Sequence, residues 1–535
     1  MGAACLAMAL APLFATSTPA DDALPAAAEP APGPGAAAGD RFAILEFRVL
    51  HNTVLPARQV ERAVYPHLGA EMTFNDVQAA RADLEKAYRD AGFSTVYVDI
   101  PEQSVDSGII RLSVTEGRLD HVAVRGTRYF MNRRILAAVP SLEPGTVPHF
   151  PEVQQELARL NQASPDLRVA PILKPGPMPG TVDVDLKVKD DLPLHASAEV
   201  NDRYTADTSH TRVNVNVSYD NLFQRYQSLS LQYQTAPENS RDAKVLAATY
   251  LAPLTGLGAT VALFAVSTDS DVATVGTLAV LGKGHVYGSR YIIPLPPSGK
   301  FFPTLTFGLD LKKFDENVLL ESGSGLQTPI KYLNWSAVFG GSLVQERGST
   351  SFTIATNFGI RGLLNDPIEF ESKRFDAKPD YMYWHADASH VQPLLWGTEV
   401  ALRMAGQYTT EPLIDNEQFA IGGVDSVRGY LEAEDLGDIG IEGSVELRSP
   451  HLDSAFGIHP REAYVYLFYD AGVVSLIDPL PSQSARHDLQ GWGVGFRVSG
   501  FAGFDAGLDW ARSLVSTTYE SVGDSRIHFH FRYGF

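Results

Sequence analysis

The sequence predicts a transmembrane antiparallel β-barrel over residues 192–535, preceded by two small α/β modules. From residue 192 onward, apolar and polar residues alternate with a period of two, and helical periodicity disappears. Between residues 41 and 191, an order of strand, helix, helix, strand, strand occurs twice. No apolar run approaches the ~20 residues that a transmembrane helix requires. If such a chain spans a membrane, it must therefore do so as a barrel.

Charge and cysteine content exclude several classes of protein. The formal net charge of -20 argues against a nucleic-acid partner, which would favour a basic surface. Charged residues make up 20% of the chain and aromatic residues 10%, with 45 glycines, a balance that suits a β-structure facing lipid and also an ordinary soluble β-protein. The only cysteine is Cys5, so we expect neither a disulfide framework nor a thiolate metal site in the rest of the chain.

The first forty residues predict a leader and a spacer. Residues 6–14 are apolar and residues 15–20 are small, which is typical of a secretory signal peptide, although no Lys or Arg precedes the apolar segment. We therefore expect residues 1–20 to be a signal peptide that is cut near Ala20. Residues 21–40 are rich in Ala, Pro and Gly and predict an extended linker, because they cannot bury a core.

The first α/β module is expected over residues 41–117. Pro56 can open one helix. Thr73 is suited to cap a second helix with Asp76 three residues later, and Gly92 is a natural stop for it. The expected strands are residues 42–50, 93–100 and 109–115.

The second module is expected over residues 118–191 and repeats this order after about 75 residues. A generic pair of small α/β domains would show the same pattern. The expected strands are residues 119–124, 169–173 and 181–188, and the expected helices are residues 132–139 and 151–161.

Alternation in the C-terminal part is clearest at its end. An apolar outer face and a polar inner face at period two are typical of a transmembrane barrel. A soluble β-sandwich would also alternate, but it would not need an aromatic last residue. The roughly 340 residues from 193 onward allow about 17 strands, hence 16 or 18 in an even-stranded barrel. The last strand places Ile527, Phe529, Phe531, Tyr533 and Phe535 on one face and His528, His530, Arg532 and Gly534 on the other.

A Gly-rich loop at residues 418–438 interrupts the alternating pattern. It holds Arg428 between small residues, and an arginine folded away from water needs an anionic partner. Asp470 is a candidate, because it shares a strand face with Tyr466 and Phe468 and is followed by Gly472. An exposed surface turn is the alternative interpretation.

Together the segments GGVDSVRGY (422–430) and FYDAG (468–472) resemble the VRGF/Y loop and the F-x-D-x-G strand of the BamA-like superfamily. More narrowly, IGGVDSVRGYLEAEDLGD is similar to the two-partner secretion transporters (TpsB; the ShlB/FhaC/HecB family), and the paired modules resemble polypeptide-transport-associated (POTRA) modules. The resemblance selects 16 strands. It implies that the loop bearing Val427, Arg428, Gly429 and Tyr430 folds into the barrel lumen, where Arg428 meets a wall site formed by Phe468, Asp470 and Gly472.

The resemblance also implies a location, partners and a function. We expect a Gram-negative outer-membrane pore, with its modules in the periplasm, that recognises and translocates a large unfolded exoprotein of the adhesin or haemolysin type. Outer-membrane lipid and the barrel-assembly machinery would be its other partners, and the terminal Phe535 resembles the signal that this machinery reads. Many relatives carry an amphipathic plug helix near the N-terminus, but residues 21–40 show no amphipathic pattern. The alternatives are an assembly factor of the BamA branch and a passive porin or receptor.

Motifs of other functions are missing from the sequence. It has no G-x-S-x-G elbow and no phosphate-binding loop, so we expect neither an enzyme nor a cofactor. His528 and His530 lie two apart without a third ligand, and polar lumen side chains are the favoured interpretation over a metal site. The acidic residues Glu432, Glu434, Asp435 and Asp438 lack EF-hand spacing and predict a solvated or pore-lining patch.

Overall fold

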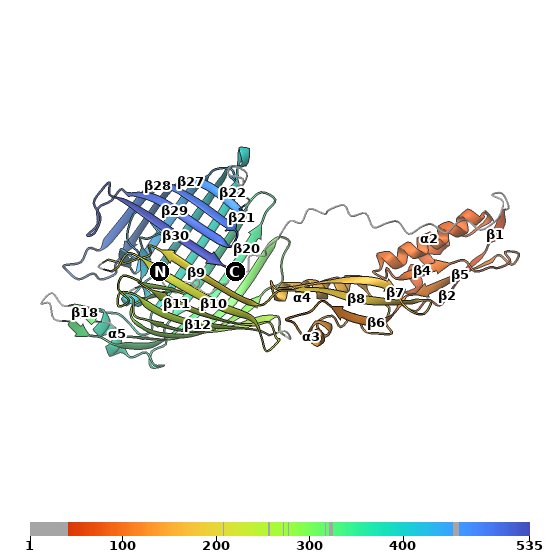
Figure 1. Ribbon diagram of the computed structural model, residues 1–535, viewed down its shortest axis with the longest axis horizontal. Coiled ribbons are helices and arrows are strands. Elements are labelled where there is room, and N and C mark those ends of the chain that lie inside the picture. Colours follow the sequence, from red (N-terminus) through yellow and green to blue (C-terminus); the bar gives the residue numbers. More distant parts are fainter. Residues whose placement is uncertain are drawn as a thin grey trace. The chain divides into compact units, whose positions relative to one another are not determined.

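The computed structural model describes residues 41–535 except 207, 255–256, 271, 276–277, 316, 320–324 and 453–459 (Figure 1). The expected signal peptide and linker lie outside the described residues. The chain divides into two compact units. One unit comprises the described residues up to Pro193 together with Phe223–Tyr226. The other unit comprises Leu194–Leu222 and Gln227–Phe535. No helix within the described part of the chain is long and apolar enough to cross a membrane.

The first module has the expected helices and strands, with one difference at its start. Residues 42–50 form two strands rather than one, because the N–H groups of Leu45 and Glu46 both donate to Gly108 O, at 2.8 and 3.2 Å, which bends the chain. The first half then pairs with an additional short strand, and the second half pairs in parallel with β5 in the sheet β2-β5-β4. The elements are β1 (Phe42–Ile44), β2 (Glu46–Leu50), α1 (Ala57–Val64), η1 (Tyr65–His67), β3 (Gly69–Met72), α2 (Phe74–Asp90), β4 (Val96–Asp99) and β5 (Ile109–Glu116).

Helix α2 begins at the predicted cap. Asp76 accepts hydrogen bonds from the N–H and the hydroxyl of Thr73, at 2.7 and 2.8 Å. These bonds, chiefly the one from the backbone N–H, lower the pKa of the Asp76 carboxyl. The hydrogen bonds to the ionised Asp76 carboxylate therefore stabilise the folded module at any pH above the pKa that Asp76 has in the unfolded chain. This stabilisation is lost as the pH falls through the lower pKa that Asp76 has in the folded module.

We expect Asp76→Asn to destabilise the first module at neutral pH but not in acid, where the wild-type carboxyl is also protonated. Urea unfolding of a fragment comprising residues 41–193, followed at neutral pH and near pH 3, measures the difference. Asp83→Asn is the matched control, because Asp83 lies on the same helix and its carboxylate contacts the side chain of His67 instead of the cap. A destabilisation of equal size at both pH values would contradict the assignment.

The second module repeats the arrangement with a three-stranded sheet of order β6-β8-β7. Its core joins both helices to the sheet through Ile135, Leu157 and Leu186. Strands β6 and β8 are parallel, and β7 is an antiparallel edge strand. The elements are β6 (Arg118–Arg125), α3 (Asn132–Ala137), α4 (Phe150–Ala163), β7 (Leu167–Pro175) and β8 (Thr181–Asp190).

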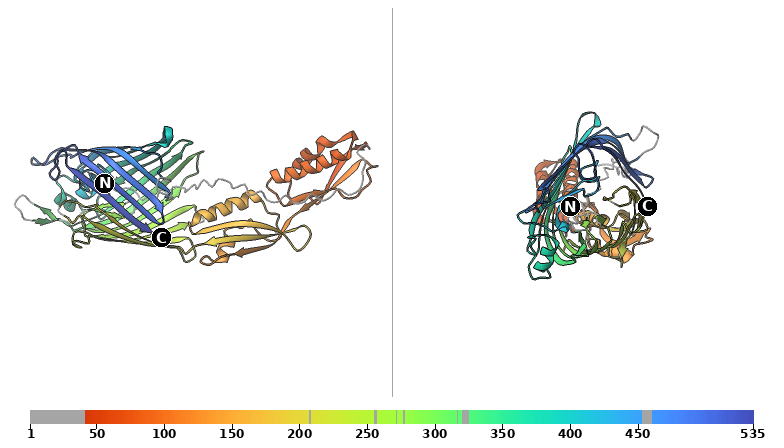
Figure 2. Two further views of the ribbon diagram at one scale, coloured as in Figure 1. Left: turned by 45° about the horizontal axis from the view of Figure 1, so that its top comes forward. Right: turned by 90° about the vertical axis from the view of Figure 1, so that its left-hand side faces the viewer.

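Sixteen antiparallel strands close into a barrel, which confirms the predicted fold class and strand number. Each strand pairs with the next along the chain, and the last pairs with the first; the strands are visibly tilted (Figure 2). The strands are β9 (Leu194–Asn201), β10 (Arg212–Leu222), β11 (Gln227–Thr235), β12 (Lys244–Leu254), β13 (Ala259–Thr268), β16 (Gly284–Pro294), β17 (Phe301–Phe314), β20 (Ile330–Val344), β21 (Ser349–Phe358), β22 (Met382–Pro393), β23 (Glu399–Thr409), β26 (Ile439–Arg448), β27 (Glu462–Ser475), β28 (Arg486–Phe501), β29 (Phe504–Ser513) and β30 (Ser525–Gly534).

The two faces of the wall differ as the alternation predicts. Apolar residues such as Val217, Leu231 and Phe531 are exposed on the outer face. Polar residues such as Asn334 and Asp470 are buried on the inner one. The connections contain β14 (Val272–Val275), β15 (Leu278–Leu281), β18 (Asn317–Leu319), β19 (Gly325–Gln327), α5 (Pro367–Lys373), η2 (Leu395–Gly397), η3 (Asp415–Glu417), β24 (Phe419–Ile421) and β25 (Asp435–Gly437).

Candidate functional site: the loop between β23 and β26

The Gly-rich loop between β23 and β26 folds against the inner face of the barrel. Its base is the small β24–β25 pair, and β24 and β25 both pack on β27. Gly429 has φ +100°, and a Cβ there would lie 3.3 Å from Ser513 N. A residue with a side chain would be strained and crowded at this position, so glycine lets the loop approach the wall closely.

Arg428 and Asp470, which we predict as partners from the sequence, are in contact. The guanidinium Nε and Nη2 lie 2.7 and 2.8 Å from the two Asp470 oxygens, and the Arg428 N–H donates to Asp470 at 3.1 Å. Nη1 also reaches Glu446 at 2.9 Å, and Nη2 reaches Ser444 Oγ at 3.1 Å. The side chains of Arg428 and Asp470 are 3% and 0% exposed, so each depends on the other to compensate its buried charge.

Phe468 completes the arginine pocket. Its ring centroid lies 3.5 Å from the Arg428 guanidinium carbon, a close cation–π stack. Gly472, two positions beyond Asp470, leaves room for the loop, because a Cβ there would lie 3.1 Å from the Val427 side chain. Sequence reasoning did not identify Ser444 and Glu446 as partners. The sequence feature that could have identified them is the alternation along β26. Ser444 and Glu446 lie on its polar face, and Ile441, Val445 and Leu447 lie on the opposite, apolar face.

Three glycines on β28 shape the wall beside this pocket. Gly491, Gly493 and Gly495 pair in register with Asp470, Phe468 and Tyr466 respectively. A Cβ on Gly493 would lie 2.6 Å from the Phe468 ring, and one on Gly495 would lie 2.2 Å from the Tyr466 ring. A Cβ on Gly491 would lie 2.1 Å from Arg428 O. The glycines therefore make room for both aromatic rings and for the loop backbone.

We expect Gly491→Ala to weaken the seating of the loop and to reduce the secretion that the resemblance implies, while the barrel still inserts. The new methyl group would overlap Arg428 O, which belongs to the backbone and cannot move without moving the loop. Export is measured in the medium, and insertion is checked by heat-modifiable migration of the outer-membrane protein in gels. Gly443→Ala is the control, because a Cβ there would meet its nearest neighbour at an ordinary 3.5 Å. Equal secretion by both variants would contradict the proposed seating.

Tyr430 and Gly429 attach the loop to the last strands. The Tyr430 hydroxyl donates to Gln490 O at 2.8 Å and accepts from the Val515 N–H at 3.0 Å. The Gly429 N–H donates to His528 Nε2 at 3.1 Å. The loop therefore reaches from β26 to β30 along the inner wall.

Two further clusters hold the ends of the loop. At its start, Glu417 accepts hydrogen bonds from Lys312, Tyr332 and Tyr383 on the wall. At its end, Asp438 pairs with Arg374 from the α5 connection and accepts from the Ile477 N–H at 2.7 Å. Asp438 is fully buried, so the prediction of a solvated or pore-lining acidic patch is wrong for this residue.

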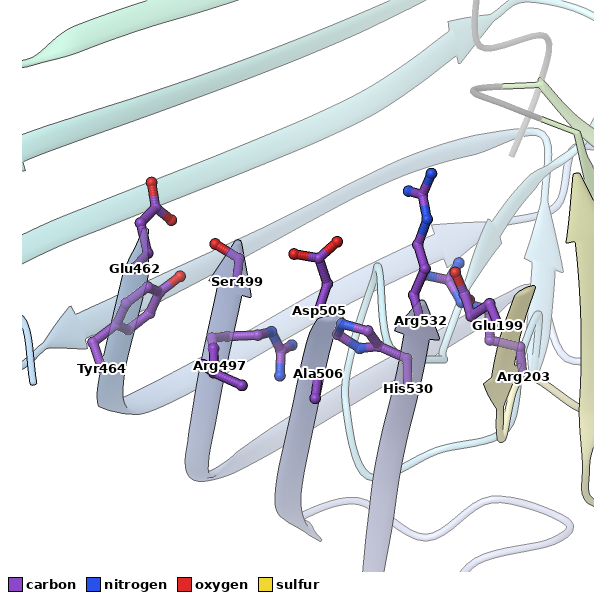
Figure 3. Close-up of a pocket in the computed structure, with 11 residues that line it drawn as sticks. Glu199, Arg203, Glu462, Tyr464, Arg497, Ser499, Asp505, Ala506, His530 and Arg532 are labelled. Carbon is purple, nitrogen blue, oxygen red and sulfur yellow. The ribbon is translucent and has the colours of Figure 1, made fainter. Parts of the chain in front are cut away.

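A polar cavity of about 390 Å³ lies along the inner wall from β27 to β9 (Figure 3). Opposite charges face each other across its strands, since Arg532 is in register with Glu199 on one side and Asp505 on the other. Arg497 also lines it and forms a bidentate pair with Asp509. Such a surface presents both signs of charge.

The terminal Phe535 lies at the first–last strand junction. Its backbone N–H donates to Ala196 O at 3.0 Å, its O accepts from the Ala196 N–H at 3.1 Å, and its side chain is exposed. His530 lines the cavity, whereas His528 is buried against the loop.

Comparison with known proteins agrees with this architecture. The model of the haemolysin secretion/activation protein family ShlB/FhaC/HecB matches residues 180–498, and the ShlB-type POTRA domain model matches residues 42–117. The outer membrane transporter CdiB of Dickeya dadantii is 22% identical over 414 residues, which cover 75% of this chain and 71% of that protein.

Solved structures share the fold. CdiB from Escherichia coli aligns with a TM-score of 0.60 at 18% identity and covers 96% of this chain and 93% of that one. BamA from Haemophilus ducreyi, lacking POTRA domains 1–3, aligns with a TM-score of 0.59 at 15% identity and covers 92% of this chain and 100% of that one.

Together with the match to the family model, a 16-stranded barrel with preceding POTRA-type modules and a loop anchored to its inner wall defines a protein-transporting barrel of the outer membrane. The chain belongs to the haemolysin secretion/activation protein family ShlB/FhaC/HecB, because the family model matches more than half of it. It is an outer-membrane transporter of two-partner secretion, and its POTRA-type modules lie in the periplasm.

Proposed function

We propose that this transporter recognises one large unfolded exoprotein of the adhesin or haemolysin type in the periplasm and passes it through the barrel to the cell surface or medium. The observation that carries the proposal is the anchoring of the loop, which lines the inner wall from β26 to β30 and is held only by non-covalent contacts. An extended chain has a smaller cross-section than a folded domain, so its passage would displace the loop less.

The Arg428 pocket is proposed as the point that sets the position of the loop. Val427, Arg428, Gly429 and Tyr430 form the loop side of this site, and Phe468, Asp470 and Gly472 form the wall side. A bidentate buried pair is costly to break from one side, yet it can exchange for contacts with a polar client inside the same lumen. The mixed charges of the neighbouring cavity are suited to such transient contacts.

Client recognition is proposed at the edges of the module sheets. In the second module, β7 is a nine-residue edge strand that exposes Ile172 and Leu173, and in the first module β4 is an edge that exposes Tyr97. An extended client can add a strand at such an edge, with backbone hydrogen bonds for affinity and neighbouring apolar side chains for specificity.

The proposed process makes and breaks no covalent bond and uses no cofactor. The client folds outside the cell, which prevents its return and drives net transport. We propose that the chain itself reaches the membrane through the barrel-assembly machinery, with Phe535 as part of the signal.

Comparative proteomics of a deletion strain tests the function. We expect one large β-rich exoprotein to disappear from the medium, an unchanged set of outer-membrane barrels, and restoration by the wild-type gene. The rival function is assembly of other barrel proteins, which the fold shared with BamA permits. Depletion of many outer-membrane barrels in the deletion strain would establish that rival and refute the proposed secretion of one client.

A further inference from the structure

The first and last strands of the barrel meet along the shortest paired stretch of the wall. The ladder between β9 and β30 runs from His530↔Asn201 to Gly534↔Ser197 and comprises five residue pairs, against nine between β29 and β30. Beyond it, the Asp202 N–H donates to Phe529 O at 3.3 Å, and the Asp202 carboxylate accepts from the Phe529 N–H at 2.7 Å. A side chain therefore takes part in the closure where the regular ladder ends (β9 and β30 lie side by side in Figure 1).

His528 connects this carboxylate to the loop. Its Nδ1 lies 3.0 Å from Asp202 Oδ2, and its Nε2 lies 3.1 Å from the Gly429 nitrogen. A backbone N–H can only donate, so Nε2 must accept and carries no proton. Nδ1 then carries the proton and donates it to Asp202. The two hydrogen bonds thus define a neutral imidazole in a single tautomer, buried at 3% exposure.

The residues after Asp202 also contact the loop. Arg203 pairs with Asp425, and Tyr204 O accepts from the Glu432 N–H at 3.1 Å. Three consecutive residues that follow the first strand are therefore joined to the loop, one of them through His528. The loop spans the junction instead of merely resting on β26 and β27.

We propose that His528 is a positioning residue that couples the seating of the loop to the closure between β9 and β30. Loss of the Nε2 acceptor would leave the Gly429 N–H without its partner and weaken the attachment of the loop to β30. This inference goes beyond the proposed function, because it concerns how the empty barrel is closed and its test needs no client.

Two substitutions separate the two bonds of His528. Asparagine places its amide nitrogen near the position of Nδ1, so His528→Asn keeps the donor to Asp202 and removes the acceptor for Gly429. Glutamine places its amide oxygen near the position of Nε2, so His528→Gln keeps the acceptor for Gly429.

The measurement is the conducting fraction of the purified full chain in planar lipid bilayers at neutral pH. We expect His528→Asn to raise it about tenfold over the wild type, the factor for losing one buried hydrogen bond. His528→Gln should keep the wild-type value. His530→Gln, on the same strand face, is the control that should also keep the wild-type value.

A cross-link then tests whether the opening occurs at the junction. Ala198 and Tyr533 are directly opposed on β9 and β30, and opposed residues of an antiparallel pair lie within disulfide range. In a Cys5→Ser background, the pair Ala198→Cys and Tyr533→Cys should suppress the His528→Asn increase until reductant is added. The proposal would be overturned by a His528→Asn variant that conducts no more than the wild type, by an equal increase in His528→Gln, or by an increase that the disulfide leaves unchanged.

Discussion

Replacing Arg428 by alanine is expected to stop secretion while the barrel remains folded and inserted. The substitution leaves the fully buried Asp470 without its partner, which costs about 3–5 kcal/mol when one side of a buried pair is removed. The sixteen strands hold one another without Arg428, so this cost falls on the position of the loop. Client in the medium and heat-modifiable migration of the barrel measure the two effects separately.

The neighbouring Arg448 supplies a matched control. It binds the same Glu446 carboxylate at 2.8 Å, but it belongs to β26 and not to the loop. Arg448→Ala should therefore retain most secretion. Arg428→Lys should fall between wild type and alanine, because an ammonium keeps the charge but cannot reproduce the planar fork on Asp470. Normal secretion by Arg428→Ala would refute the assigned role of the loop.

Removal of residues 42–190 is expected to abolish client export and to leave an inserted, conducting barrel. All strands of the barrel begin at Leu194 or later and close on one another, so the deletion removes none of the wall. It removes both sheets whose edges we propose to bind the client. Bilayer conductance and client in the medium are the two measurements, and export by the barrel alone would exclude recognition by the modules.

A finer variant locates recognition within the modules. Leu173→Asp places a charge on the exposed side of edge strand β7, where it should lower export without unfolding the sheet. Leu45→Asp is the control, because Leu45 is also exposed but lies between β1 and β2, away from this edge. Equal export by the two variants would place recognition elsewhere.

The position of Asp470 on the inner face could be predicted from the sequence because side-chain direction along a strand has a period of two. The contacts of Arg428 with Ser444 and Glu446 could not be predicted from the sequence. They lie beside Arg428 because Ser444 is in register with Asp470 and Glu446 with Phe468. Register depends on how two strands slide past one another, which the alternation within either strand does not specify.

The burial of Asp438, at the acidic end of the loop, could not be predicted from the sequence either. Asp438 is buried because Arg374, which lies 64 residues earlier in the chain, reaches it from another connection. Likewise His528 was predicted as a polar lumen residue, but its link to Gly429 and Asp202 requires the last strand, the loop and the first strand to come together.

The sequence by itself determined the barrel, its strand faces, the repeated module order and the loop motif, because these follow from local periodicity and from residue types at short spacing. The tertiary structure alone decided which inner-face residues meet: Arg428 with Glu446, Asp438 with Arg374, and His528 with both the loop and the first strand. These contacts, which join residues up to 326 positions apart, depend on strand register and on closure of the wall.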